Sequence, residues 1–416
     1  MNRKVLISSF LGNALEFYDF TLYGVFAGLF AVQFFPSSNP INGLLASWGA
    51  FAAGFIMRPF GATLFGFIGD KFGRKKALGL SIIFMGIPTL ILGLLPTYQS
   101  IGIMAPLMLV MCRLLQGLCT GGEYNGAAIF AIEHHAHKGN GLISGIITSS
   151  CVLGALSATG IGYVILHYGN PQWGWRIAFI LGALISLIGF FIRNRVDESP
   201  DFLKEEAVKS SYMPHIYETI KYNGRSFFMT FLLGSINGVL SYSLFGFLNM
   251  YLNKYLHINM DIAVFANLFG LLAFMVSCPI AGIILDRIGI NNFILASLSL
   301  VLIIPVLVYN LLELKDLYFL IIAQVIYGVL VGIVAGPQHA IAKSIFPTSY
   351  RYTGVSLSFC TGMGFIGGSM PLMATYLIEK TGNIYIPAAI VSTLGFLTLL
   401  YYLLFIRTKV IKRAFS

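Results

Sequence analysis

Charged residues are scarce in this chain of 416 residues, since Asp, Glu, Lys and Arg together make up 10%. Soluble domains carry roughly 25%. Hydrophobic residues reach 57%, and the mean hydropathy is +0.82. This balance excludes a water-soluble globule. The apolar residues come in runs of about 20 or more, the length that a helix needs to cross hydrocarbon, whereas a transmembrane β-barrel shows short alternating segments. The sequence therefore predicts an all-α polytopic membrane protein.

The motifs of enzymes and metal sites are also missing. No HExxH, GxSxG or Walker pattern occurs, so the chain is not expected to be an enzyme. The five cysteines form no CxxC and all lie in apolar runs, which indicates small core residues. The segment EHHAHKG (133–139) places three histidines at poor spacing for a preorganised metal site, and we expect a solvated loop there. We expect neither a metal nor a cofactor.

A net charge of +10 raises the possibility of nucleic-acid binding. The charges, however, fall in short loops between apolar runs rather than in a basic patch. We therefore expect the lipid bilayer and a small molecule as partners, no nucleic acid, and a monomeric chain.

Twelve apolar runs are candidate membrane spans, and several are long enough to tilt. The first begins near the N-terminus and is too long for the apolar part of a signal peptide, so we expect it to be retained. The spans are expected at 6–35, 43–68, 77–95, 101–131, 141–167, 174–193, 225–253, 262–285, 291–311, 317–345, 354–379 and 384–407.

The loop charges predict the orientation of these spans. With a cytoplasmic N-terminus, most Lys and Arg residues, Arg193 included, fall on the cytoplasmic side. The opposite loops hold only Lys254, Lys315 and Lys380, with Arg176 near a boundary. This is a strong positive-inside bias, and it places both termini in the cytoplasm.

The chain divides into two similar halves. The only long polar stretch lies at 194–224, between spans six and seven. Gly66-x3-Asp70-Lys71-x-Gly73 follows the second span, and Gly282-x3-Asp286-Arg287-x-Gly289 follows the eighth. We expect an N-terminal six-helix bundle at 1–195, a cytoplasmic linker at 196–224 and a C-terminal six-helix bundle at 225–416. Such parallel repeats are typical of many secondary transporters.

Several motifs carry a family resemblance over nearly the whole chain. They are GNALEFYDFTLYG (12–24), RPFGA (58–62), GFIGDKFGRKKAL (66–78), RLLQGLCTGGEYNGA (113–127), WGWRIAF (173–179), DESPDF (197–202) and FPTSYRYTGVS (346–356). The loop signature at 66–78 resembles that of the major facilitator superfamily. Together the motifs resemble its metabolite:proton symporter branch, which includes proline/betaine, α-ketoglutarate, citrate and shikimate transporters. The resemblance implies the twelve-helix major facilitator fold with two six-helix pseudo-repeats.

This chain departs from the branch in two places. The second-half loop signature is reduced to Asp286–Gly289 without its basic run. The chain also ends soon after Arg413, without the long coiled-coil tail of some osmosensing members. Osmosensory regulation is therefore not expected.

Ionisable side chains inside the spans are the strongest functional signal. Glu16 and Asp19 lie about ten and thirteen residues into span one, near the membrane midplane at ~1.5 Å per residue. Tyr23 shares their face. Arg113 reaches a similar depth in span four. Groups of this kind are costly in a membrane and are usually functional.

Two further charged residues, Arg58 and Glu123, lie deeper toward the cytoplasm, so acids and arginines converge on one polar cavity. A carboxyl group near a guanidinium stays ionised, and it binds a proton more readily once that pairing is lost. The proton-coupling candidates are Glu16, Asp19 and Glu123.

The expected substrate site combines residues of both halves. A guanidinium offers a planar fork to a substrate carboxylate, and the resemblance implies the same roles for first-helix acids and a fourth-helix arginine. A structural ion-pair network is the alternative. In the second half, polar and aromatic side chains of spans seven and ten line the cavity or pack in the core. The expected substrate-binding residues are Tyr23, Arg58, Arg113, Gln116, Asn237, Tyr242 and Tyr327.

The loop Asp70–Lys76 is expected to act as a conformational latch. Gly73 permits a tight turn, and Asp70 is able to cap a neighbouring helix N-terminus. The resemblance implies a latch between the halves that includes Asp70, Gly73 and Arg74. A topology anchor is the alternative reading.

The function expected from these observations is proton-coupled import of a small carboxylate-bearing metabolite across the bacterial cytoplasmic membrane. The leading substrates are a zwitterion of the proline or betaine type, or an organic acid. A proton-driven exporter of drugs or siderophores is the alternative. Span five lacks the Gly-Pro signature of proton–drug antiporters, which favours uptake. A non-transporting sensor is a further alternative.

Overall fold

A computed structural model describes residues 3–38, 40–134, 139–198, 216–346 and 351–407. Twelve of its helices are long and apolar enough to cross a membrane, from Leu6–Phe34 to Ile386–Ile406. No strand occurs among these described residues. The expected all-α, twelve-span architecture is confirmed.

The chain forms two compact units. The first unit comprises Met1–His134 and Ser150–Met213, and the second comprises His135–Ser149 and Pro214–Ser416. The helix α6 (Asn140–Tyr168) contributes to both. The boundaries expected from the polar stretch at 196–224 stay a prediction.

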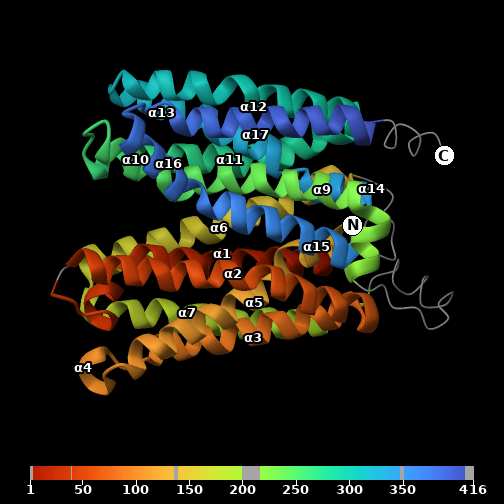
Figure 1. Cartoon of the computed structure of the whole chain (residues 1–416). Helices are drawn as coiled ribbons and strands as arrows, with labels where there is room; N and C mark the ends of the chain where they lie inside the picture. The colour runs from red at the N-terminus through yellow and green to blue at the C-terminus, as the bar shows by residue number, and fades with distance from the viewer. Residues whose placement is uncertain (1–2, 39, 135–138, 199–215, 347–350, 408–416) are drawn as a thin grey trace. The chain divides into compact units, whose positions relative to one another are not determined.

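The first unit is a bundle whose helices lie alongside one another (Figure 1). The helix α5 packs against α2 and α3, α7 packs against α3, and α1 touches α2, α5 and α7. Besides part of α6, the helices are α1 (Arg3–Phe34), α2 (Pro40–Phe72), α3 (Arg74–Leu94), the short α4 (Tyr98–Ile101), α5 (Met104–Glu133) and α7 (Pro171–Asn194).

Glycine allows α2 and α5 to approach backbone to backbone. A Cβ atom at Gly117 of α5 would lie 2.7 Å from the Cα of Gly54 on α2. Side-chain carbons do not approach so closely, so only glycine fits here, as is common where membrane helices meet. This contact brings Arg58 of α2 and Arg113 of α5 toward the same part of α1.

Aromatic residues fill one end of the first unit. Phe26, Phe30 and Phe34 of α1 are almost completely buried, and Trp175 of α7 packs against them. The rings of Phe30 and Trp175 meet edge to face with centroids 5.0 Å apart, a favoured arrangement of aromatic pairs. The interior of the unit is therefore apolar at this end and polar further along α1.

The second unit is also a helical bundle, in which α11 packs on α13, α12 on α17, and α9 on α15. Besides part of α6, its helical segments are α9 (Ile216–Tyr242), η1 (Ser243–Phe247), α10 (Leu248–Lys254), α11 (Met260–Ile288), α12 (Ile290–Glu313), α13 (Leu317–Ala335), α14 (Gln338–Ile345), α15 (Arg351–Thr361), η3 (Gly362–Gly367), α16 (Gly368–Thr381), α17 (Ile386–Tyr401) and η4 (Tyr402–Ile406).

Irregular turns interrupt several spans of the second unit. The segments η1, η3 and η4 are π-helical, and Gly336 with Pro337 separates α13 from α14. A π turn holds more residues than an α turn and re-aims the side chains that follow it. In span seven, η1 starts directly after Tyr242, so the regular α-helical spacing of side chains ends at this residue.

Candidate functional site

Asp19 lies at the centre of a polar cluster in the first unit. Its side chain is 3% exposed. The hydroxyl of Thr89 on α3 donates a hydrogen bond of 2.9 Å to Oδ2, and the amide of Gln116 on α5 donates to the same oxygen. Gln116 also donates to Thr89 Oγ1 over 3.0 Å. Two helices, α3 and α5, therefore hold one carboxylate oxygen of α1 in place, while Oδ1 has no hydrogen-bond partner.

Arg113 joins this cluster through Gln116. It is completely buried, and its Nη1 donates to Gln116 Oε1 over 2.8 Å. Its Nε and Nη2 have no hydrogen-bond partner. The structure thus brings Asp19, Gln116 and Arg113 together, with the amide as the link between the two charges. Two buried donors remain for another acceptor.

Aromatic rings surround both arginines. The guanidinium carbon of Arg113 lies 4.5 Å from the ring centroid of Tyr23, 4.9 Å from that of Phe20 and 5.4 Å from that of Phe51. The guanidinium carbon of Arg58 lies 4.7 Å from the Phe20 centroid. Cation–π contacts at such distances stabilise a guanidinium without neutralising its charge.

Tyr23 supports this arrangement from α1. Its hydroxyl donates to the carbonyl oxygen of Ser47 over 3.0 Å, and Ser47 Oγ donates to Ala27 O over 2.9 Å. The ring of Tyr23 therefore packs against Arg113 with its polar end already bound to α2. Tyr23 contributes a ring face to the site rather than a free hydroxyl.

Glu16, one turn before Asp19, has a different environment. Its side chain is 1% exposed, and neither carboxylate oxygen has a hydrogen-bond partner. The charged groups that act on it are Arg58 and Glu123. Glu16 and Asp19 therefore lie on the same helix face, but only Asp19 accepts hydrogen bonds.

Glu123 belongs to a separate ionic cluster. Arg193 of α7 lies 2.7 Å from its Oε1, and Ser81 of α3 donates to its Oε2 over 2.5 Å. Arg193 also donates to the carbonyl oxygen of Leu78 over 2.8 Å. All three side chains are almost completely buried. This pattern is that of a structural ion pair joining α3, α5 and α7.

Arg193 was expected among the loop charges because it ends span six. The structure places it instead in the last turn of α7 with a side chain that is 1% exposed, whereas the side of the membrane on which it lies stays a prediction. The sequence signal that would have identified it is Glu123, a charged residue inside span four that requires a counter-ion.

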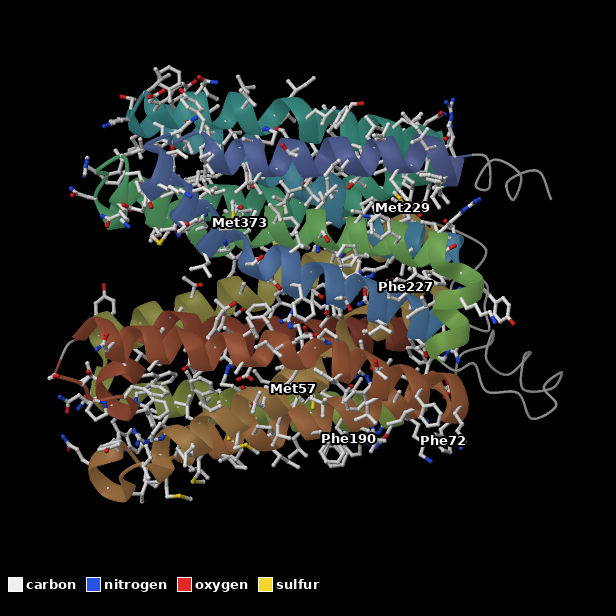
Figure 2. The ribbon with its side chains drawn as sticks, in the orientation of Figure 1. Met57, Phe72, Phe190, Phe227, Met229 and Met373 are labelled. Carbon is white, nitrogen blue, oxygen red and sulfur yellow. The ribbon has the colours of Figure 1, made fainter. Side chains whose placement is uncertain are left out.

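The turn between α2 and α3 contains the expected latch residues. Gly73 adopts φ 104°, a conformation that favours glycine. Arg74 is buried, donates to Gly69 O over 2.8 Å, and has Nε 3.6 Å from Glu133. The side chain of Asp70 lies outside the described part of the structure. Phe72 and Phe190 mark this end of the first unit in Figure 2.

Glu198, from the DESPDF motif, caps α3. Its Oε1 accepts from the backbone N–H groups of Arg74 at 3.0 Å and Lys75 at 3.2 Å. An anionic group at a helix N-terminus is favourable because the unpaired N–H groups and the helix dipole attract it. The chain after α7 is thereby attached to the start of α3.

Asp286 makes the equivalent contact in the second unit. Its Oδ1 accepts from the backbone N–H of Gly141 over 2.8 Å, and its Oδ2 from that of Leu142 over 3.0 Å. Asp286 thus caps the N-terminus of α6. The repeated Gly-x3-Asp pattern contained this signal, although the basic run that follows it in the first half is absent here.

The expected second-half residues differ in their surroundings. Asn237 accepts from Ser241 over 3.2 Å, and its amide lies 3.9 Å from the sulfur of Met363. Tyr327 is fully buried, whereas Tyr242 is half-buried. The structure does not gather these three side chains into one hydrogen-bonded cluster within the described part of the second unit.

Known proteins are similar to this chain in both sequence and fold. The family model of the Major Facilitator Superfamily matches residues 9–370. The chain is 31% identical over 413 residues to a putative proline/betaine transporter of Staphylococcus haemolyticus, covering 95% of this chain and 86% of the relative. It is 28% identical over 412 residues to the proline/betaine transporter of Escherichia coli K12, covering 95% and 82%.

A solved structure of the proton:xylose symporter XylE superposes with a TM-score of 0.78 at 15% identity, covering 97% of this chain and 95% of that one. The human organic anion transporter MFSD10 gives a TM-score of 0.65 at 15% identity, covering 96% and 99%. At these identities the two structures establish the fold.

The ion pair of Glu123 and Arg193 generates a stability prediction. Glu123→Gln leaves a buried guanidinium without its counter-charge, which costs roughly 3–5 kcal/mol. We expect a lower midpoint of thermal unfolding in detergent, measured by intrinsic fluorescence, and a partial recovery in the double variant Glu123→Gln/Arg193→Gln. A wild-type midpoint in Glu123→Gln would contradict the structural role.

Proposed function

The chain belongs to the Major Facilitator Superfamily of secondary transporters, and from this premise we propose that it is a proton-coupled symporter that imports a small carboxylate-bearing metabolite. One observation carries the proposal. A buried arginine with unsatisfied donors lies in the same bundle as a buried carboxyl group that has no donor. The first arrangement suits an anionic substrate group, and the second suits a proton.

Glu16 is the group that we assign to the proton. Burial without a hydrogen-bond donor disfavours the ionised form of a carboxyl group, and Glu16 has no donor on either oxygen. Access to water on one side of the membrane would then allow it to ionise, and enclosure would favour protonation again. Asp19 is less suited, because Thr89 and Gln116 already bind its charge. Glu123 is paired with Arg193.

Arg113 is the group that we assign to the substrate carboxylate. Its Nε and Nη2 are the edge of the guanidinium that binds a carboxylate through two parallel hydrogen bonds. Gln116 occupies Nη1 and fixes the plane of the fork. Arg58 and Tyr23 are the further residues of the first unit that we assign to the substrate, and Asn237, Tyr242 and Tyr327 stay the candidate residues of the second unit.

The relatives support a zwitterion as the substrate. Two are named as proline/betaine transporters, and a further one as a glycine betaine/proline/ectoine/pipecolic acid transporter of Dickeya dadantii. Each substrate in these names carries one carboxylate, which Arg113 would bind. An organic acid is the second candidate. No observation favours export.

Transport would proceed by alternating access within the bacterial cytoplasmic membrane. The charge distribution of the loops supports cytoplasmic termini, and we take a monomer as the working unit. The latch residues Asp70, Gly73 and Arg74, with Asp286 as the repeat counterpart, would stabilise the state that is closed to the cytoplasm. The binding site would then face each side of the membrane in turn.

The role of Glu16 predicts uncoupled transport in Glu16→Gln, which keeps the shape of the side chain and removes its proton. In proteoliposomes, accumulation of labelled glycine betaine or proline against its gradient should be lost, while exchange of labelled for unlabelled substrate should persist. Thr63→Val on α2, a hydroxyl that donates only within its own helix, serves as a control and should accumulate normally. Accumulation at the wild-type level in Glu16→Gln would refute the assignment.

The role of Arg113 predicts weaker binding in Arg113→Lys. A lysine retains the charge but not the planar fork, and we expect at least a ten-fold loss of affinity, about 1.4 kcal/mol. The measurement is scintillation-proximity binding of labelled betaine or proline to purified protein with an unchanged unfolding midpoint. Unaltered affinity in such protein would exclude a contact between Arg113 and the substrate.

The latch predicts a change of conformational population in Asp286→Asn and Asp70→Asn. Loss of a charged helix cap removes about 0.3–1 kcal/mol, which shifts a two-state population roughly two- to five-fold. We expect faster thiol labelling of a cysteine engineered on the cytoplasmic side of the cavity, with little change in affinity. Glu379→Gln, which breaks an exposed pair with Lys254, should label at the wild-type rate. Reduced transport without faster labelling would contradict the latch.

A further inference from the structure

Phe20 contacts two buried guanidinium groups. Its ring centroid lies 4.7 Å from the guanidinium carbon of Arg58 and 4.9 Å from that of Arg113. The two arginines come from different helices, α2 and α5, and Phe20 comes from α1. Two like charges repel one another at short range, so the shared ring fixes where each of them lies.

Further rings complete an aromatic cluster, which we define as Phe20, Tyr23, Phe51 and Phe55. Phe51 and Phe55 lie with centroids 4.6 and 4.7 Å from that of Phe20. Phe55 also lies 4.6 Å from the guanidinium carbon of Arg58. Except for Tyr23, these rings are only partly buried. They form a partly exposed surface that holds two cations.

Aromatic contacts have a consequence that ion pairs lack. A carboxylate partner would cancel the charge of the guanidinium and occupy its N–H groups, whereas a ring face does neither. Arg113 accordingly keeps two unbound donors although it is completely buried. The aromatic cluster thus leaves the N–H groups of Arg113 open to an anion, although the charge of Asp19 acts on this guanidinium through space. The ring faces toward the two guanidiniums are already used.

We propose that Phe20 is a positioning residue for substrate recognition: its ring holds Arg58 and Arg113 so that the first unit binds the carboxylate end of the substrate, while the ammonium end binds outside the aromatic cluster. This inference rests on the proposed function and names the part of the substrate that the site in α1, α2 and α5 recognises. Aromatic rings without neighbouring arginines would suggest a site for a quaternary ammonium group. Here the ring faces are occupied by guanidinium groups.

Competition between isosteric probes tests the assignment. Glycine betaine, 3,3-dimethylbutyrate and choline share a branched head group, but 3,3-dimethylbutyrate lacks the positive charge and choline lacks the carboxylate. We expect 3,3-dimethylbutyrate to displace labelled betaine from the wild-type protein at least ten-fold more effectively than choline. A stronger effect of choline, or no displacement by 3,3-dimethylbutyrate, would overturn the inference.

Substitution of Phe20 tests the positioning role. Phe20→Leu removes the ring face, and we expect about a ten-fold weaker affinity for both betaine and 3,3-dimethylbutyrate. Phe20→Tyr retains the face and should bind within two-fold of the wild type. Phe26→Leu is the matched control, because Phe26 is a fully buried phenyl of the same helix whose ring packs on Phe30. It should bind as the wild type does.

The outcomes separate this inference from the proposed function. Wild-type affinity in folded Phe20→Leu protein, together with weak binding in Arg113→Lys, overturns the role of Phe20 and leaves the proposed function intact. Equal loss in Phe20→Leu and Phe20→Tyr also overturns it. Wild-type affinity in Arg113→Lys contradicts the proposed function itself, whatever Phe20→Leu shows.

Discussion

Each charge buried in a membrane bundle requires compensation, and the rest of the first unit depends on how its buried charges obtain it. Glu123 receives an opposite charge from Arg193. Arg58 and Arg113 receive aromatic faces. Glu16 receives no hydrogen bond. The ion pair gives a rigid contact, the π contacts leave Nε and Nη2 of Arg113 available for a ligand, and lack of a donor favours a neutral acid. In this account Glu123 and Arg193 stabilise the bundle, Arg113 binds the substrate and Glu16 carries the proton.

Helix packing places these groups within reach of each other. The close approach of α2 and α5 at Gly54 and Gly117 leaves no room for side chains between their backbones. Arg58 and Arg113 are therefore both directed toward α1, where Phe20 lies. The caps formed by Glu198 and Asp286 act at helix ends and keep the termini of α3 and α6 satisfied. The polar cluster around Asp19 thus depends on the close contact between α2 and α5 that Gly54 and Gly117 permit.

The sequence predicted the twelve helices because long apolar runs and short charged loops are sufficient for that inference. It also placed Asp19 and Arg113 at a similar depth, although it did not identify Gln116 as the link between them. It did not predict the partner of Glu123, because Arg193 ends its span and resembles a loop charge. It missed Phe20, since one phenylalanine in an apolar helix carries no distinctive signal. The π turns could not be predicted from the sequence either, because they depend on tertiary packing. Which carboxyl group lacks a donor is a three-dimensional property.

Proton movement during substrate entry tests the central claim most directly. Purified protein in liposomes that contain a pH-sensitive dye is given external glycine betaine or proline, without an imposed pH gradient and with the membrane potential clamped. The account predicts acidification of the lumen as substrate enters, and loss of that acidification in Glu16→Gln. Substrate entry without any change in lumenal pH in the wild-type protein would contradict it.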